Sequence, residues 1–105
     1  MQYLVRRESS SVTVLELEGE LTGPWATQEL GMAIEEAVRL GKGELILDMA
    51  KTESINSSCL GRLFLAKKEL LAQGIKLKIR KCSESVYNTL LLVRADLIID
   101  IETPR

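Results

Sequence analysis

The chain has 105 residues, the size of one domain, which we expect to span residues 1–105. Its 14 Lys and Arg against 15 Asp and Glu leave a net charge of −1, which indicates neither a nucleic-acid partner nor an anionic membrane. No histidine is present to build a Ser-His-Asp or Cys-His arrangement, and the two cysteines fit neither a disulfide framework nor a zinc pattern, so we expect no enzyme activity, no metal and no cofactor. Charged side chains begin at Arg6 and no apolar run approaches membrane-spanning length, so we expect a cytoplasmic protein without membrane insertion.

The N-terminal segment predicts a β-hairpin and then a helix. Residues 2–7 and Val12 to Glu18 predict two strands joined by a polar turn, with Gly19 ending the second. Next comes a helix entrance, where Thr22 or Gly23 can cap and Pro24 suits the first helical position. Apolar side chains then recur at helical spacing until glycines 41 and 43 end the helix.

The central stretch reads LILDMAKTESINSSCLGRLF from Leu45 to Phe64 and predicts a strand, a loop and a helix. A strand from Glu44 to Asp48 is typical of one buried on both faces of a sheet. We expect a polar loop after Asp48, with Asp48 as an acceptor that orders it. The helix is expected from about Ser58 to Gln73, ending at Gly74.

The C-terminal part predicts a strand, a helix and a last strand. Ile75 to Ile79 alternates strictly, and the basic face of Lys76, Lys78 and Arg80 is either a solvated face or a contact for an acidic partner. Ser83 can cap a third helix, and residues 97–101 resemble a short strand. The expected order is β-β-α-β-α-β-α-β.

Ser57 is the candidate modification site. It stands with Asn56 and Ser58 at the expected helix N-terminus, where free N–H groups and the macrodipole stabilise negative charge. Ser57 is therefore a plausible phosphate acceptor. It can equally be an N-cap that satisfies a helix N–H, and both roles can hold together. Ser58 is the second choice, interpreted as part of the first helical turn.

Three segments resemble the STAS family, the domain of bacterial anti-sigma factor antagonists, of stressosome proteins and of the cytoplasmic ends of sulfate-type transporters. Leu17 to Thr22 is similar to the family's G-E-L-D entrance to the first helix. Asp48 to Gly61 is similar, without a gap, to its D-L-S-x-V-x-x-I-D-S-S-G-L-G signature. Val86 to Leu97 resembles its closing helix and turn.

This resemblance implies an α/β fold, a STAS-like mixed sheet of four to five strands with helices packed mainly on one face. It also implies that Ser57 accepts a phosphate from a partner kinase that is itself the anti-sigma factor. In the family the unphosphorylated form binds that partner and frees the sigma factor. About two added negative charges would break such a packed interface by repulsion and desolvation.

The expected partner surface combines the helix entrance with the serine loop, and it contains Thr22, Gly23, Trp25, Asn56, Ser57, Ser58 and Cys59. Trp25 is an interface anchor if exposed and a core residue if buried. Cys59 is a small half-buried thiol or, alternatively, a redox sensor. Three residues depart from the family pattern, because Thr22 and Asn56 replace aspartates and Cys59 replaces glycine.

The leading hypothesis is a regulatory protein-protein interaction module, an anti-sigma factor antagonist in a partner-switching system toggled by serine phosphorylation. Its partner would be an anti-sigma factor with serine-kinase activity, and the module itself would be a monomer or weak dimer. The alternative is a constitutive structural STAS subunit of a larger assembly, such as a transporter or lipid-transport ATPase, that has lost phosphorylation. Ser57 favours the first hypothesis, and Asn56 and Cys59 favour the second.

Overall fold

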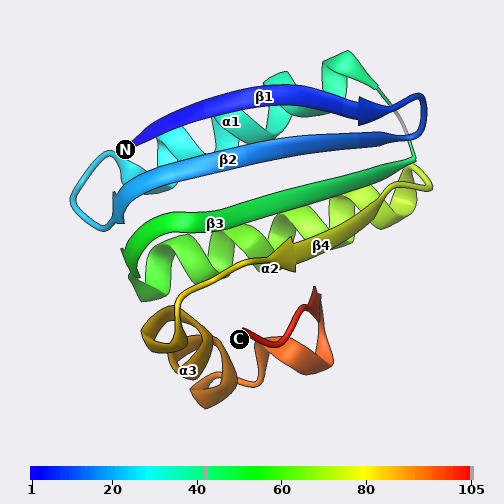
Figure 1. The fold of residues 1–105 in the computed structure, drawn as a ribbon. Coiled ribbons are helices and arrows are strands. Elements are labelled where there is room, and N and C mark those ends of the chain that lie inside the picture. Colours follow the sequence, from blue (N-terminus) through cyan, green and yellow to red (C-terminus); the bar gives the residue numbers. More distant parts are fainter. Residues whose placement is uncertain (42, 105) are drawn as a thin grey trace.

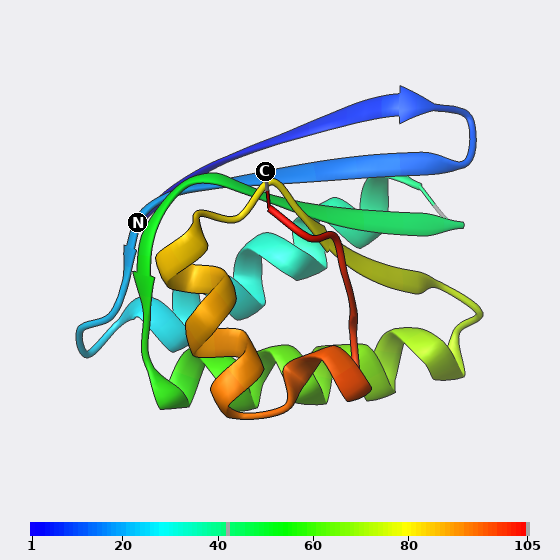
Figure 2. The same ribbon diagram turned by 60° about the horizontal axis from the view of Figure 1, so that its bottom comes forward.

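The computed structural model describes residues 1–41 and 43–104, which form one five-stranded sheet with three α-helices against one face (Figures 1 and 2). The elements in chain order are β1 (Gln2–Ser9), β2 (Val12–Leu21), α1 (Ala26–Leu40), β3 (Glu44–Ile55), α2 (Ser57–Ala72), β4 (Lys76–Arg80), α3 (Glu84–Leu92), the 3-10 turn η1 (Ala95–Leu97) and β5 (Asp100–Ile101).

The strands lie in the order in which they occur along the chain. β1 pairs with β2 in the antiparallel sense, and the other three neighbouring pairs are parallel. Each connection between parallel neighbouring strands passes through a helix. Because these crossover connections have the same handedness and all advance across the sheet in the same direction, their helices lie on the same face. The mixed α/β sheet with helices on one face, expected from the sequence, is confirmed.

The hydrophobic core lies between the helix layer and the sheet. Leu15 and Leu17 of β2 and Leu47 of β3 are almost fully buried, as are Leu30 of α1 and Leu63 of α2. These side chains come from the two central strands and from the apolar stripes of the helices that cross over them. Burial of this apolar surface is the main favourable contribution to folding.

β3 is more than twice as long as the sequence predicted, because residues 49–55 extend the strand and do not form a polar loop. Those residues pair with β2, where Thr52 lies opposite Gly19 and Ile55 opposite Leu21. The buried Thr52 hydroxyl donates a 2.8 Å hydrogen bond to the backbone oxygen of Leu17. The predicted end of β2 at Gly19 is also wrong, since Gly19 stays inside the strand with a φ of 99°.

The first helix starts later than predicted. Residues 22–25 form a turn, and α1 begins at Ala26 with Trp25 in the N-cap position and without a side-chain capping bond. Gly23 has a φ of 89°, a left-handed conformation that a helix entrance cannot use and that glycine adopts at little cost. Neither Thr22 nor Gly23 is therefore the cap, and Pro24 is not the first helical residue.

The other predicted boundaries hold to within a residue or two, except at the C-terminus. Ser83 caps α3 by accepting a 3.2 Å bond from the Val86 N–H. Gly74 follows α2 with a φ of 76°, as expected of a residue that ends a helix. The last strand is shorter than predicted, since it holds only Asp100 and Ile101, and Leu97 lies in η1.

Leu47 tests the central placement of β3. Its side chain is fully buried, so Leu47→Ala should lower the free energy of unfolding by about 2–5 kcal/mol in urea denaturation. Leu4→Ala is the matched control, because Leu4 is 60% exposed on the edge strand β1 and should change stability much less. Equal losses in the two variants would contradict the packing described here.

Candidate functional site

The start of α2 is fixed by Asn56. Its side-chain oxygen accepts a 2.8 Å hydrogen bond from the Cys59 N–H, and its own carbonyl accepts from Leu60 N at 3.0 Å. Asn56 is therefore the N-cap, and Ser57 is the first helical residue. The interpretation of Ser57 as the cap is wrong, and its hydroxyl is not needed to satisfy the Cys59 N–H.

The end of β2 lies directly beside this helix start. Ile55 pairs with Leu21, and the Asn56 N–H donates a 3.0 Å bond to the Leu21 carbonyl. The Thr27 hydroxyl of α1 lies 3.7 Å from the Cys59 sulfur of α2. The turn after β2 and the first turn of α2 are thus neighbours, as the sequence analysis expected from the resemblance.

Ser57 and Ser58 are both exposed at the positive end of α2. Their backbone N–H groups belong to the first turn and have no intrahelical acceptor. The first turn of α2 contains no acidic residue that would offset the helix dipole. The site is therefore electrostatically suited to an added negative charge. Its N-cap is the neutral amide of Asn56, at a position where the family pattern has an aspartate.

Trp25 supplies an exposed apolar surface in the turn between β2 and α1. It is 68% exposed, which decides between the two interpretations of this residue in favour of a surface position. Gly23 is exposed beside it, and Thr22 is half-buried. A large aromatic ring left in water at a turn is a common anchor in protein interfaces.

Cys59 does not belong to the accessible surface. Its side chain is fully buried and points into the core beneath the serines, so it cannot block the approach of a partner backbone. The expectation of a half-buried thiol underestimated its burial. A thiol enclosed in this way is also a poor redox sensor, because such cysteines are accessible to solvent. Cys59 contributes to the site by supporting it from below.

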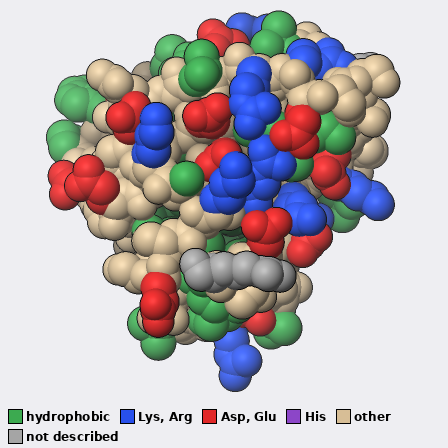
Figure 3. All heavy atoms as spheres, in the orientation of Figure 1, with side chains coloured by type: hydrophobic (Ala, Val, Ile, Leu, Met, Phe, Trp, Pro, Cys, Tyr) green, Lys and Arg blue, Asp and Glu red, His purple; other side chains and the backbone are tan. Residues whose placement is uncertain are grey.

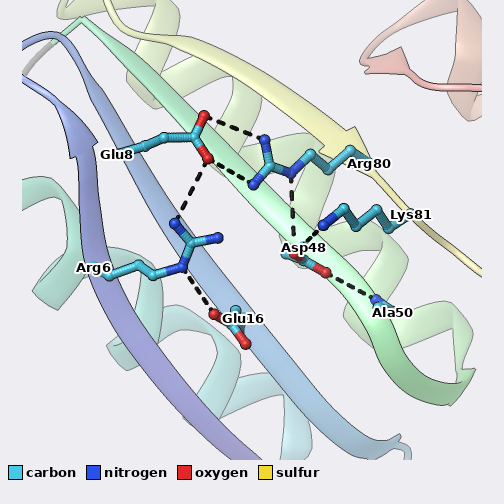
Figure 4. A network of polar contacts seen from close by, with 7 residues as sticks. All are labelled: Arg6, Glu8, Glu16, Asp48, Ala50, Arg80 and Lys81. Carbon is cyan, nitrogen blue, oxygen red and sulfur yellow. Dashed lines mark hydrogen bonds and ion pairs between the residues drawn. The ribbon is translucent and has the colours of Figure 1, made fainter.

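A second polar cluster lies on the sheet face that carries no helices. Figure 4 shows Glu8 of β1 reaching Arg80 at the end of β4 across β2 and β3, with distances of 2.9 and 3.3 Å. Arg6 joins Glu16 at 3.0 Å and Glu8 at 3.6 Å. The hydrogen bond from Arg80 lowers the pKa of Glu8, and the same bond raises the pKa of Arg80.

Asp48 takes part in this cluster instead of ordering a loop. One of its oxygens accepts a 3.1 Å bond from Ala50 N inside β3, and the other lies 3.9 Å from both the Arg80 and the Lys81 nitrogens. The pairing of Glu8 with Arg80 is not evident from the sequence, because the two residues are 72 positions apart and no local pattern links them. Among the three residues of the expected basic face, Arg80 thus forms an ion pair within the chain, with Glu8.

Charged side chains cover the face of the sheet that carries no helices. Val14 and Ile46 are paired across β2 and β3 on this open face, and both are buried although neither belongs to the core on the helix side. Arg6 lies opposite Val14, and Lys78 lies opposite Ile46, so long charged side chains border this apolar pair. Such side chains cover apolar surface with their stems while their heads stay in water.

The open face is hollowed beside the cluster, but its charge is mixed. Figure 3 shows acidic and basic side chains interspersed over this side of the molecule. The hollow has a volume of about 440 Å³ and is lined by Arg6, Lys51 and Lys81 together with Glu16, Glu18 and Asp48, besides uncharged residues. Equal numbers of both signs select no ligand charge. Within residues 1–41 and 43–104, no group of three acidic or cysteine side chains is placed to hold a metal ion.

The family follows from a match over nearly the whole chain. The family model described as STAS domain matches residues 3–103, so the chain belongs to the STAS domain family. A comparison with curated proteins found no match. Among the described residues, no helix is both long and apolar enough to cross a membrane.

Three solved structures share the fold at low sequence identity. A putative anti-sigma factor antagonist of Thermotoga maritima is 19% identical, with a TM-score of 0.77 over 96% of this chain and 86% of that protein. The unphosphorylated anti-sigma factor antagonist SpoIIAA is 16% identical, with a TM-score of 0.70 over 99% and 90%. Phosphorylated SpoIIAA, a Bacillus cell fate determinant, is 17% identical, with a TM-score of 0.68 over 97% and 92%.

The capping assignment can be tested by comparing two neighbouring residues. Asn56→Ala removes the acceptor of the Cys59 N–H and should cost about 1 kcal/mol of unfolding free energy, within a range of roughly 0.5–2 kcal/mol. Ser57→Ala removes no bond of this kind and should cost much less. Urea denaturation of both variants measures the difference, and a larger loss for Ser57→Ala would show that the cap is misassigned.

The pKa of Glu8 predicts how acid affects the charged cluster. Because that pKa is lowered in the folded protein, the pairing stabilises the fold fully above the ordinary value of 4.5 and loses this effect as pH falls through the lowered value. Glu8→Gln should therefore be less stable than the wild type at neutral pH and nearly as stable in strong acid. Urea denaturation across that range checks this, with Glu18→Gln as the control because Glu18 makes no ion pair among the described residues. A pH-independent deficit in Glu8→Gln would contradict the pairing.

Proposed function

We propose that this STAS domain is an anti-sigma factor antagonist, a regulatory module that binds an anti-sigma factor with serine-kinase activity and is released when Ser57 is phosphorylated. The observation that carries the proposal is the position of Ser57. It is exposed as the first residue of α2, beside free helix N–H groups and a first turn without acidic residues. The module acts by association and performs no chemistry of its own.

The proposed partner surface consists of Thr22, Gly23, Trp25, Asn56, Ser57 and Ser58. The Asn56–Leu21 backbone bond keeps its two halves side by side. Trp25 offers apolar area that a partner can bury, while the serines offer hydroxyl groups. A phosphate on Ser57 would therefore enter the middle of the contact, where an unpaired dianion is costly to desolvate.

Phosphorylation of this kind changes binding without unfolding the domain. The hydroxyl of Ser57 makes no contact on which the fold depends, and the helix N-terminus tolerates the added charge. SpoIIAA in its unphosphorylated and phosphorylated forms is similar to this chain to nearly the same degree, with TM-scores of 0.70 and 0.68. That the phosphorylated form still shares this fold supports a switch that acts without unfolding the domain.

Substitutions at Ser57 should separate binding from stability. Ser57→Ala should bind the kinase partner persistently, and Ser57→Asp should weaken binding by about 1–3 kcal/mol, with little change in thermal unfolding for either. Isothermal titration with a candidate serine-kinase anti-sigma factor measures the affinities, and mass spectrometry after incubation with that kinase and ATP locates the phosphate. Ser58→Ala is the matched control and should remain a substrate.

Two outcomes would revise the proposal. Phosphate on Ser58 alone would move the site by one residue. No phosphate with any candidate kinase, together with unaltered binding by both Ser57 variants, would favour the constitutive structural subunit. That reading is consistent with Asn56 and Cys59, which replace the aspartate and glycine of the family signature.

A further inference from the structure

Gly61 occupies an unfavourable place for a glycine, because it lies in the second turn of α2. Glycine destabilises the interior of a helix more than any residue except proline, since it loses the most backbone freedom on folding and has no side chain to pack. The helix nevertheless runs without interruption from Ser57 to Ala72. A glycine here therefore lowers the stability of α2, and its presence calls for a compensating contact.

The fold itself does not supply that contact. The φ of Gly61 is not positive, so its backbone conformation does not require a glycine. Beyond its chain neighbours and the adjoining helix backbone, a Cβ built on Gly61 would have no atom of the described residues within 4 Å. The opposite holds at Gly31 of α1, where a Cβ would come within 2.9 Å of Arg62 Nε. Gly31 thus makes room for a side chain of this chain, whereas Gly61 makes room for none.

Gly61 borders the serines on the outer surface of α2. It is exposed, and it follows Ser57 by four residues and Ser58 by three. Positions with these spacings are neighbours on a helix, roughly 5–6 Å apart. Leu65 lies one turn further along and is 49% exposed. Figure 2 shows α2, drawn in green, on the side of the helix layer away from the sheet, so this stretch of bare backbone between the serines and Leu65 can be approached from outside.

We propose that Gly61 is a contact residue for the kinase partner, and that a segment of the kinase packs directly on the bare α2 backbone when its active site reaches Ser57. This inference rests on the proposed function and extends the partner surface by one turn of α2. During transfer, the Ser57 oxygen bonds to the γ-phosphorus of ATP, the bond to ADP breaks, and the hydroxyl proton passes to a base of the kinase.

The chemistry at Ser57 fixes what occupies the neighbouring surface. The reacting oxygen and phosphorus must approach to about 3–3.5 Å, so the residues that enclose the kinase active site meet the surface one helical turn away. A Cβ at Gly61 would project into that contact. Leu65 lies where the same segment can bury apolar area on the far side of Gly61.

Two substitutions at Gly61 test the contact, because stability and binding should change in opposite directions. Gly61→Ala and Gly61→Gln both introduce good helix formers into open space, so each should raise the midpoint of thermal unfolding by about 4–8 °C. Isothermal titration with a candidate serine-kinase anti-sigma factor should show binding weakened about fivefold by Gly61→Ala and at least about tenfold by Gly61→Gln. Phosphorylation of Ser57 by that kinase and ATP should slow in the same order.

Ala72→Gln is the matched control. Ala72 is exposed in the last turn of α2, about 22 Å along the helix axis from Ser57, and the substitution extends a side chain there just as Gly61→Gln does. Its affinity for the kinase and its rate of phosphorylation should equal those of the wild type.

Three results would overturn the inference while leaving the proposed function intact. Wild-type affinity in both Gly61 variants would show that the kinase does not touch this residue. Equal weakening by alanine and glutamine would assign the glycine to flexibility of the helix, since the two residues differ in size much more than in helix propensity. A lower unfolding midpoint in Gly61→Ala would show that the fold itself needs the glycine. A wild type that neither binds nor is phosphorylated would instead overturn the proposed function, and this inference with it.

Discussion

The pairing of β2 with β3 along their whole length is the constraint on which both the fold and the candidate site depend. It places Leu15 and Leu47 side by side at the centre of the core. Continued past Asp48, it brings Leu21 to Ile55, so that α1 and α2 begin at the same end of the sheet. A protein in which β3 ended at Asp48 could keep the core but would leave Ser57 on a loop, without a fixed relation to Trp25.

The sequence predicted the element order and the sheet well, because each helix and most strands carry an uninterrupted period. It failed where two strands slip relative to each other. Register shifts between Glu16 and Glu18 and between Gly19 and Glu20 space the buried side chains Met49, Thr52 and Ile55 three apart, which hides the two-residue alternation of a strand.

The candidate site was predicted in outline and not in detail. Polar residues between a strand and an apolar helix located the N-terminus of α2. Two adjacent polar residues, Asn56 and Ser57, however, compete for the same capping role. Only the bond from Cys59 N to the Asn56 side chain decides between them. The burial of Cys59 and the exposure of Trp25 depend on tertiary neighbours, so no local pattern reports either.

The complete burial of Cys59 has a kinetic consequence for the region around Ser57. A thiol shielded by the first turn of α2 reacts with an alkylating reagent only during moments when that turn detaches from α1 and the sheet. Its rate of labelling therefore measures how often the first turn of α2 opens near the serines. The same thiol can report whether a bound partner holds the N-terminus of α2 closed, without an engineered cysteine.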